Sequence, residues 1–110
     1  MSEPRPASGL LVSALLRRVA ALSGHGAVLS RGDATAGAIL LVLVDRGVTQ
    51  RLVERGLKPD GGYGWIASGP KALEDSQALG DYLERRRRND PDLWVVELDA
   101  PEDALAQLVE

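Results

Sequence analysis

The longest unbroken apolar run of the chain is AGAILLVLV, residues 36–44, which ends at the turn-forming residues 45–47. Its aliphatic and β-branched composition, with turn residues on both sides, predicts a strand. With a period of two, its odd-numbered residues point to one side of a sheet and its even-numbered residues to the other. Both sets are apolar, so we expect a central strand that needs cover above and below.

Helical periodicity appears near the start of the chain and again at its end. Residues 9–22 place apolar side chains over one wide face, and Ser8 precedes them as the predicted N-cap. Residues 102–109 form a shorter helical segment after a possible cap at Asp99. The first helix has enough apolar surface to cover one face of a sheet, whereas the last spans only about two turns.

A second long helix is predicted from the turn at residues 68–70, where Pro70 would take the first helical position, to Arg88. Its apolar stripe is narrow. Gly80 in its middle costs up to about 1 kcal/mol relative to Ala. A glycine at that place indicates close approach to the sheet or to another helix.

Four further segments are predicted strands, because each is bounded by residues typical of turns. The element order α-β-β-β-β-α-β-α predicts an α+β fold: a single domain with a mostly antiparallel sheet of four to five strands, packed with two main helices and a short C-terminal helix. Residues 1–8 are expected to be a flexible tail and residues 9–110 the domain. The four strands cover residues 27–31, 48–55, 63–67 and 93–99.

The amino-acid composition mainly excludes several kinds of structure and chemistry. The 110 residues suit one domain, and the absence of Phe leaves a core of aliphatic side chains. The absence of Cys excludes disulfides, thiolate metal ligands and cysteine nucleophiles. No apolar run reaches the roughly 18 residues of a membrane span, and Arg17 and Arg18 follow the N-terminal apolar stretch instead of preceding it. We therefore expect a cytoplasmic protein without membrane contact.

The net charge of −3 hides an asymmetry between the two halves of the chain. Residues 1–58 hold eight cations and four anions, whereas residues 59–110 hold five cations and twelve anions. Such a division can indicate a binding face for an anionic partner. Mutual neutralisation of the two halves in the folded domain explains it equally simply, and we favour that interpretation because neither half is extreme.

Motifs for catalysis are incomplete in this chain. Residues 64–69 have the glycine spacing of a phosphate-binding loop, but Pro70 occupies the lysine position and removes a backbone donor. His25 is the only histidine, and no other metal-ligating or catalytic residue lies near it in sequence. We therefore predict no catalytic residue, no metal site and no cofactor, and we expect that the protein is not an enzyme.

The arginines are the sharpest charged features. Arg85–Arg88 at a helix end could grip phosphates, but they also complement the negative end of the helix dipole, and we favour the structural role. Arg51 and Arg55 could contribute to a basic sheet edge. Sheets that bind nucleic acid also present stacking aromatic residues, and no strand before Tyr63 carries one.

The pattern as a whole resembles a small alphaproteobacterial family of about this length, domain of unknown function 1491. The resemblance covers residues 10–99, and residues 56–69 depart most from it. It implies a bacterial cytoplasmic protein without assigned activity, and it supplies no catalytic residues. The segments that carry it are VSA and LRR at 12–14 and 16–18, RGD at 31–33, AGAI at 36–39 and DPDLWVVELD at 90–99.

Three functional hypotheses follow, and the first is a non-enzymatic protein-interaction or regulatory module, expected as a homodimer. Its motivation is the two-sided apolar strand at residues 36–44 in a chain with few helices to cover both faces. A bare sheet face would be a patch large enough to require a partner.

The two alternatives use charged residues. A nucleic-acid accessory protein would bind through Arg46, Arg51 and Arg55, or through Arg85–Arg88. A small-ligand-binding protein or enzyme would be built around polar and aromatic residues in the segments that carry the resemblance. Those residues are Arg18, Arg31, Asp33 and Trp94.

Overall fold

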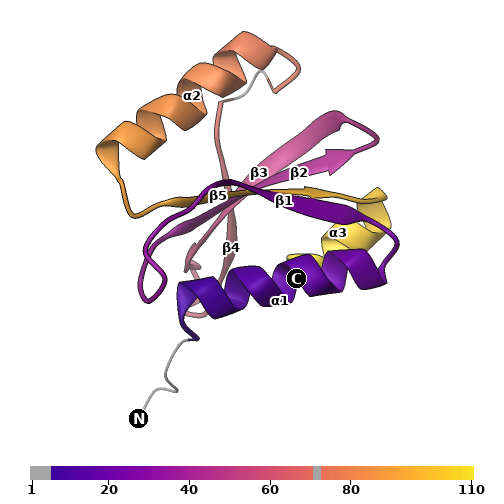
Figure 1. Cartoon of the computed structure of the whole chain (residues 1–110), viewed down its shortest axis with the longest axis horizontal. Coiled ribbons are helices and arrows are strands. Elements are labelled where there is room, and N and C mark those ends of the chain that lie inside the picture. Colours follow the sequence, from indigo (N-terminus) through magenta and orange to yellow (C-terminus); the bar gives the residue numbers. More distant parts are fainter. Residues whose placement is uncertain (1–5, 71–72) are drawn as a thin grey trace.

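A five-stranded sheet forms the middle layer of the molecule, with helices packed on both of its faces (Figure 1). The computed structural model describes residues 6–70 and 73–110. The elements follow the predicted order, and the α+β fold is confirmed. They are α1 (Ser8–Ala21), β1 (His25–Ser30), β2 (Ile39–Asp45), β3 (Val48–Leu57), β4 (Tyr63–Ser68), α2 (Ser76–Asn89), β5 (Trp94–Asp99) and α3 (Glu102–Leu108).

The strand order across the sheet is β1-β5-β2-β3-β4, so β1 and β4 are the two edge strands. β2 and β5 run parallel, with Ile39 opposite Trp94, and every other neighbouring pair is antiparallel. The crossover between the two parallel strands contains α2. The prediction of a mostly antiparallel sheet is therefore confirmed, with one parallel pair at its centre.

β2 is the central strand, as predicted from its apolar run. Residues 39–44 are each at most 3% exposed. Their odd-numbered side chains pack into a cluster with α1, β5 and α3, and their even-numbered side chains into a second cluster on the α2 side. Both faces of β2 are therefore covered within one chain, which removes the bare-strand motivation for a homodimer.

The N-terminus of α1 differs from the expectation that Ser8 caps it. The helix begins at Ser8 itself, and Ala7 stands at the N-cap without a side-chain hydrogen bond. The Ser8 hydroxyl instead donates to the Gly37 carbonyl at 2.6 Å, and the Ser8 N–H donates to the Thr35 carbonyl at 3.2 Å. The loop before β2 crosses this helix end and satisfies it through backbone groups, so a side-chain cap is not needed.

The predicted start of α2 at Pro70 is wrong. The helix begins at Ser76, and the Asp75 carboxylate caps it by accepting hydrogen bonds from the Gln77 and Ala78 N–H groups at 3.0 and 3.2 Å. A carboxylate that satisfies two helical donors is a stronger start than a proline, which satisfies none. Residues 71–72 of the predicted helix lie outside the described residues.

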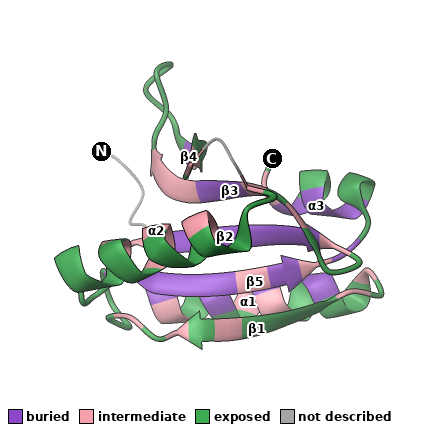
Figure 2. Cartoon of the chain, turned by 90° about the horizontal axis from the view of Figure 1, so that it is seen from above, coloured by how far each residue is buried: buried purple, intermediate pink, exposed green. Residues whose placement is uncertain are grey.

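The remaining boundaries agree with the predicted ones to within three residues. The first strand starts at His25, so this histidine lies in a strand and not in the expected connector. β3 continues to Leu57 and extends a hairpin with β4 beyond the body of the sheet (Figure 2). Figure 2 also shows that burial is concentrated in β2 and β5, whereas α2 and β1 are largely exposed.

Candidate functional site

Three of the predicted site residues meet in the loop that precedes β2. The Arg31 guanidinium lies 5.4 Å from the centre of the Trp94 ring, and Trp94 Nε1 donates to the Asp33 carbonyl at 2.8 Å. The Asp33 carboxylate accepts the backbone N–H groups of Thr35 and Ala36 at 3.2 and 2.8 Å. These contacts brace the loop against the start of β5.

Two glycines let this loop approach β5 so closely. A Cβ added to Gly32 would lie 2.1 Å from the Asp92 carbonyl oxygen, and one added to Gly37 would lie 2.2 Å from the same atom. Only glycine fits at such distances from backbone atoms. The glycine of the RGD tripeptide therefore serves loop geometry.

Arg18 lies apart from these three residues. Its Nη2 donates to the Gln107 carbonyl at 3.3 Å and so links α1 to α3. The four residues of the ligand-binding hypothesis therefore do not gather around one cavity, because Arg18 lies against α3, whereas the others lie in the loop before β2 and at the start of β5. A binding role for any of them stays a prediction.

The arginines of the central hairpin are also dispersed. Arg51 pairs with Glu102 of α3 at 3.1 Å, and Arg46 sits in the β2–β3 turn beside Asp45. Arg55 differs, because its guanidinium lies over two aromatic rings of the neighbouring β4. Its distances to the ring centres of Tyr63 and Trp65 are 5.1 and 5.4 Å.

The residue run Arg85–Arg88 divides into groups with different surroundings. Arg86 forms a two-pronged ion pair with Glu54 of β3, with one contact at 3.0 Å, and hydrogen-bonds to the Tyr82 hydroxyl at 2.8 Å. This bonding to Glu54 raises the pKa of Arg86 above its ordinary value, so the Arg86 guanidinium keeps its positive charge. Tyr82 continues the network to the Ser68 hydroxyl at 2.8 Å. The structural role that we favoured applies to Arg86.

Arg87 and Arg88 are exposed and line a groove between α2 and the β1–β5 side of the sheet. The groove has a volume of about 820 Å³. Its floor is apolar, and Leu29 of the edge strand is 50% exposed there. Further lining residues are Ser30, Arg31, Leu83, Glu84, Asp90, Pro91, Leu93 and Val95, so the predicted site residue Arg31 also lies at this groove.

Gly80 also lines this groove, on the exposed side of α2. A Cβ added to it would meet nothing within 4 Å. The expectation that Gly80 marks close approach to the sheet or to another helix is therefore wrong for the described chain. The glycine leaves the helix backbone accessible from the groove.

The groove could not be predicted from the sequence, because nothing in the sequence distinguishes Leu29 from a buried strand residue. Leu29 has the pattern of a buried strand residue, yet α2 passes over β2 and β3 and leaves β1 bare. The register shift between Val28 and Ser30 in the β1–β5 ladder marks the place where Leu29 lies. No signal in the sequence reveals how far α2 reaches across the sheet.

Two smaller hollows lie elsewhere on the surface. One of 380 Å³ lies at the start of α1 and is lined by Arg55, Tyr63 and the loop at 35–39. The other, of 490 Å³, is lined by His25, Asp45 and Asp99 among others. Across residues 6–70 and 73–110, no group of three or more His, Cys, Asp or Glu side chains could hold a metal ion, and no helix is long and apolar enough to cross a membrane.

This chain is similar to a protein family and to several proteins whose structures have been solved. Residues 7–107 match the model of a family described as "Protein of unknown function (DUF1491)". A crystal structure of a DUF1491 family protein from Caulobacter crescentus is 35% identical, with a TM-score of 0.75 over 87% of this chain and 89% of that one. Among curated protein sequences, none matches this chain.

Two solution structures are also similar. The NMR structure of a DUF1491 family protein from Caulobacter crescentus is 33% identical over 91% of this chain and 90% of that one, with a TM-score of 0.74. Protein Atu0922 from A. tumefaciens is 32% identical over 96% of this chain and 93% of that one, with a TM-score of 0.66. Both bacteria agree with the predicted alphaproteobacterial resemblance.

Proposed function

We propose that this chain, which belongs to the DUF1491 family of proteins of unknown function, is a non-enzymatic protein-interaction module. Its docking surface is the groove between α2 and the β1–β5 side of the sheet, together with the outer edge of β1. The cysteine-free sequence supports a reducing compartment, the bacterial cytoplasm, as the place where it acts.

The observation that carries this proposal is the bare edge of the sheet beside an apolar floor. β1 is an edge strand whose residues 25–27 are exposed, so one row of its backbone N–H and C=O groups faces outward. Such a row is a template for pairing with another polypeptide. Leu29 adds apolar area next to that edge, and the arginines at the rim are of a residue type enriched at protein interfaces.

A nucleic-acid function is the alternative that one observation favours. The Arg55 guanidinium over the rings of Tyr63 and Trp65 combines a cation with aromatic side chains on one face of the β3–β4 hairpin. Single-stranded nucleic acids bind to such combinations by stacking and by phosphate contact. Arg51 and Arg86 support this alternative less, because both are paired with carboxylates.

A photo-crosslinking amino acid placed at position 29 tests the proposed interaction in living cells. Leu29 is replaced by p-benzoylphenylalanine, and the matched control carries the same residue at Leu10, which is 68% exposed on α1. The expected result is a discrete covalent adduct from position 29 and none from position 10. Mass spectrometry then identifies the adduct. If neither position gives an adduct with any protein, the proposed function is wrong.

The nucleic-acid alternative has its own measurement. Binding of a fluorescent single-stranded oligonucleotide is followed by anisotropy at low salt, with the wild type and with Arg55→Gln. The alternative predicts binding that weakens steeply with salt and is reduced by the substitution. Absence of binding by the wild type at low salt would exclude it.

A further inference from the structure

We infer that the occupant of the groove is a second copy of this chain, which docks antiparallel along β1. This inference rests on the proposed function, and it adds the identity and the orientation of the partner. The argument comes from the charges at the two ends of one sheet face and from the register of β1 on β5.

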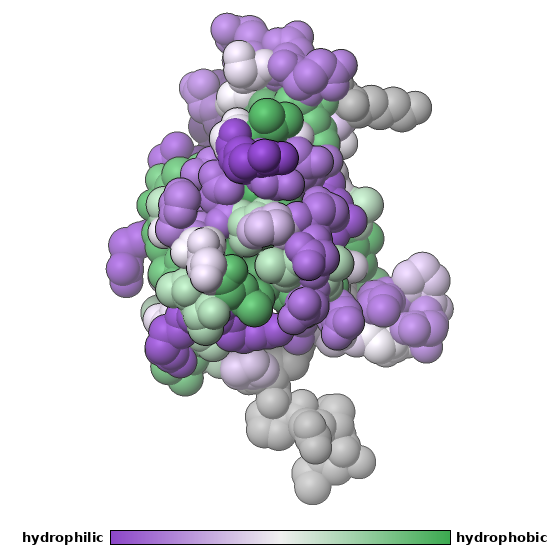
Figure 3. Space-filling view, turned by 90° about the vertical axis from the view of Figure 1, so that its right-hand side faces the viewer, coloured by the Kyte–Doolittle hydropathy of each residue, from purple (hydrophilic) through white to green (hydrophobic). Residues whose placement is uncertain are grey.

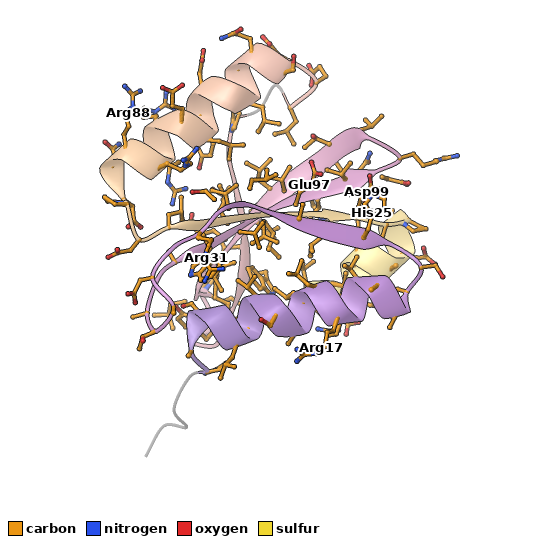
Figure 4. The ribbon with its side chains drawn as sticks, in the orientation of Figure 1. Arg17, His25, Arg31, Arg88, Glu97 and Asp99 are labelled. Carbon is orange, nitrogen blue, oxygen red and sulfur yellow. The ribbon has the colours of Figure 1, made fainter. Side chains whose placement is uncertain are left out.

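The face of the sheet beside α2 carries opposite charges at its two ends (Figure 4). Arg87 and Arg88 line the groove, and Figure 4 shows Arg88 at the C-terminal end of α2. Glu97 and Asp99 lie towards the other end of β5, on the α2 side. Among the described residues, Arg87, Arg88 and Glu97 form no ion pair, so these charges are available for a partner.

Register places these charges so that two copies complement each other. Ala27 lies opposite Glu97 and His25 lies opposite Asp99 in the antiparallel β1–β5 pair. If two β1 strands pair antiparallel about a two-fold axis at Ala27, His25 of one copy stands beside Leu29 of the other. The acidic end of one copy then lies alongside the groove, with Arg87 and Arg88, of the second.

The side chains of β1 favour close approach of another strand. Gly26 and Ala27 are small and exposed, and the strand contains no lysine or proline of the kind that protects sheet edges. The register shift between Val28 and Ser30 falls at Leu29, the last residue of this pairing, so the shared ladder is short. Contacts between the grooves and the ion pairs must therefore supply much of the binding energy.

The surface at one end of the molecule is of mixed character. Figure 3 shows the end that carries His25 and Asp99, where charged and polar side chains interrupt small apolar patches.

Complementary charge reversal tests this inference with the full chain. One variant carries Arg87→Glu with Arg88→Glu, and the other carries Glu97→Arg. Sedimentation equilibrium measures the dimer dissociation constant of each variant, of the wild type and of an equimolar mixture. A dimer of either variant alone brings like charges together at both ends of the interface. We therefore expect its dissociation constant to rise about tenfold or more. The mixture restores both sets of ion pairs, and a heterodimer should form with an affinity near that of the wild type.

Arg17→Glu is the matched control, because Arg17 is an exposed arginine on α1, on the opposite side of the sheet (Figure 4). It should leave the dissociation constant unchanged. A monomeric wild type at millimolar concentration would overturn the inference. A dimer that none of the reversals weakens would overturn it as well. Either result would leave the proposed function standing if position 29 still forms an adduct with a different protein.

Discussion

The two faces of the sheet are held by different kinds of contact. On one face, α1 and α3 pack apolar side chains against β2 and β5, and the buried cluster includes Leu15, Leu98 and Leu105. On the other face, no residue of α2 is fully buried, and the helix is tied down by the polar network of Glu54, Tyr82 and Arg86. The first face stabilises the fold, and the second combines partial packing with an open groove.

This difference shows where the chain can change without unfolding. A continuous apolar cluster loses free energy with every methylene group removed from it. A helix held by a few polar contacts can shift or detach while the sheet persists. The surface that we propose for docking lies beside α2, the helix that has no fully buried residue.

The largest expected effect comes from breaking the tightly packed face. Leu15→Ala removes a side chain that is 2% exposed between α1 and the sheet. We expect a loss of about 2–5 kcal/mol in the free energy of unfolding, as is usual for large-to-small changes in a core. Urea denaturation followed by circular dichroism measures it. Leu10→Ala is the control, because Leu10 is 68% exposed and its loss should change stability by about 0.5 kcal/mol or less.

A smaller effect is expected on the other face. Glu54→Gln removes the charge that pairs with Arg86, whose side chain is 25% exposed, while keeping the size of the residue. The free energy of unfolding should fall by about 1–2 kcal/mol, because the partner is charged and partly buried. Hydrogen exchange should rise in α2 and stay unchanged in α1.

The matched variant for this test is Glu102→Gln, which breaks the ion pair with Arg51 on the opposite face. The side chains of this pair are more exposed, 42% for Arg51 and 50% for Glu102, so the free energy of unfolding should fall only slightly. If Glu54→Gln raised exchange in α1 as much as in α2, the two faces would unfold together and the comparison between them would fail.

The fold could be predicted because its strongest signals are local. The alternating faces of β2 and β5 agree with the two observed clusters, since a period of two assigns each residue to a side without knowledge of its neighbours. The start of α2 was missed because Pro70 and Asp75 both offer helix-start signals. Only the hydrogen bonds to the Asp75 carboxylate distinguish them.

The candidate site was less predictable, because it depends on contacts between distant segments. The arginines could be identified as a set, but Arg86 and Glu54 are 32 residues apart and their pairing follows from the way α2 crosses the sheet. The exposure of Leu29 has the same origin. A residue's type and spacing indicate what it can do, whereas its partner is determined by tertiary packing.

The smallest expected effect concerns Gly80, where a substitution should increase the free energy of unfolding instead of decreasing it. A Cβ at this position meets nothing within 4 Å and the residue lies inside α2, so Gly80→Ala should raise the free energy of unfolding by up to about 1 kcal/mol through helix propensity alone. Gly32→Ala is the contrast, because its Cβ would lie 2.1 Å from a backbone oxygen and should destabilise the protein by about 1–3 kcal/mol. Thermal unfolding measures the stability of both variants relative to the wild type. A loss of stability in Gly80→Ala would mean that α2 packs more closely on its groove side than the structure shows, and the contrast between a tight and an open face would then be wrong.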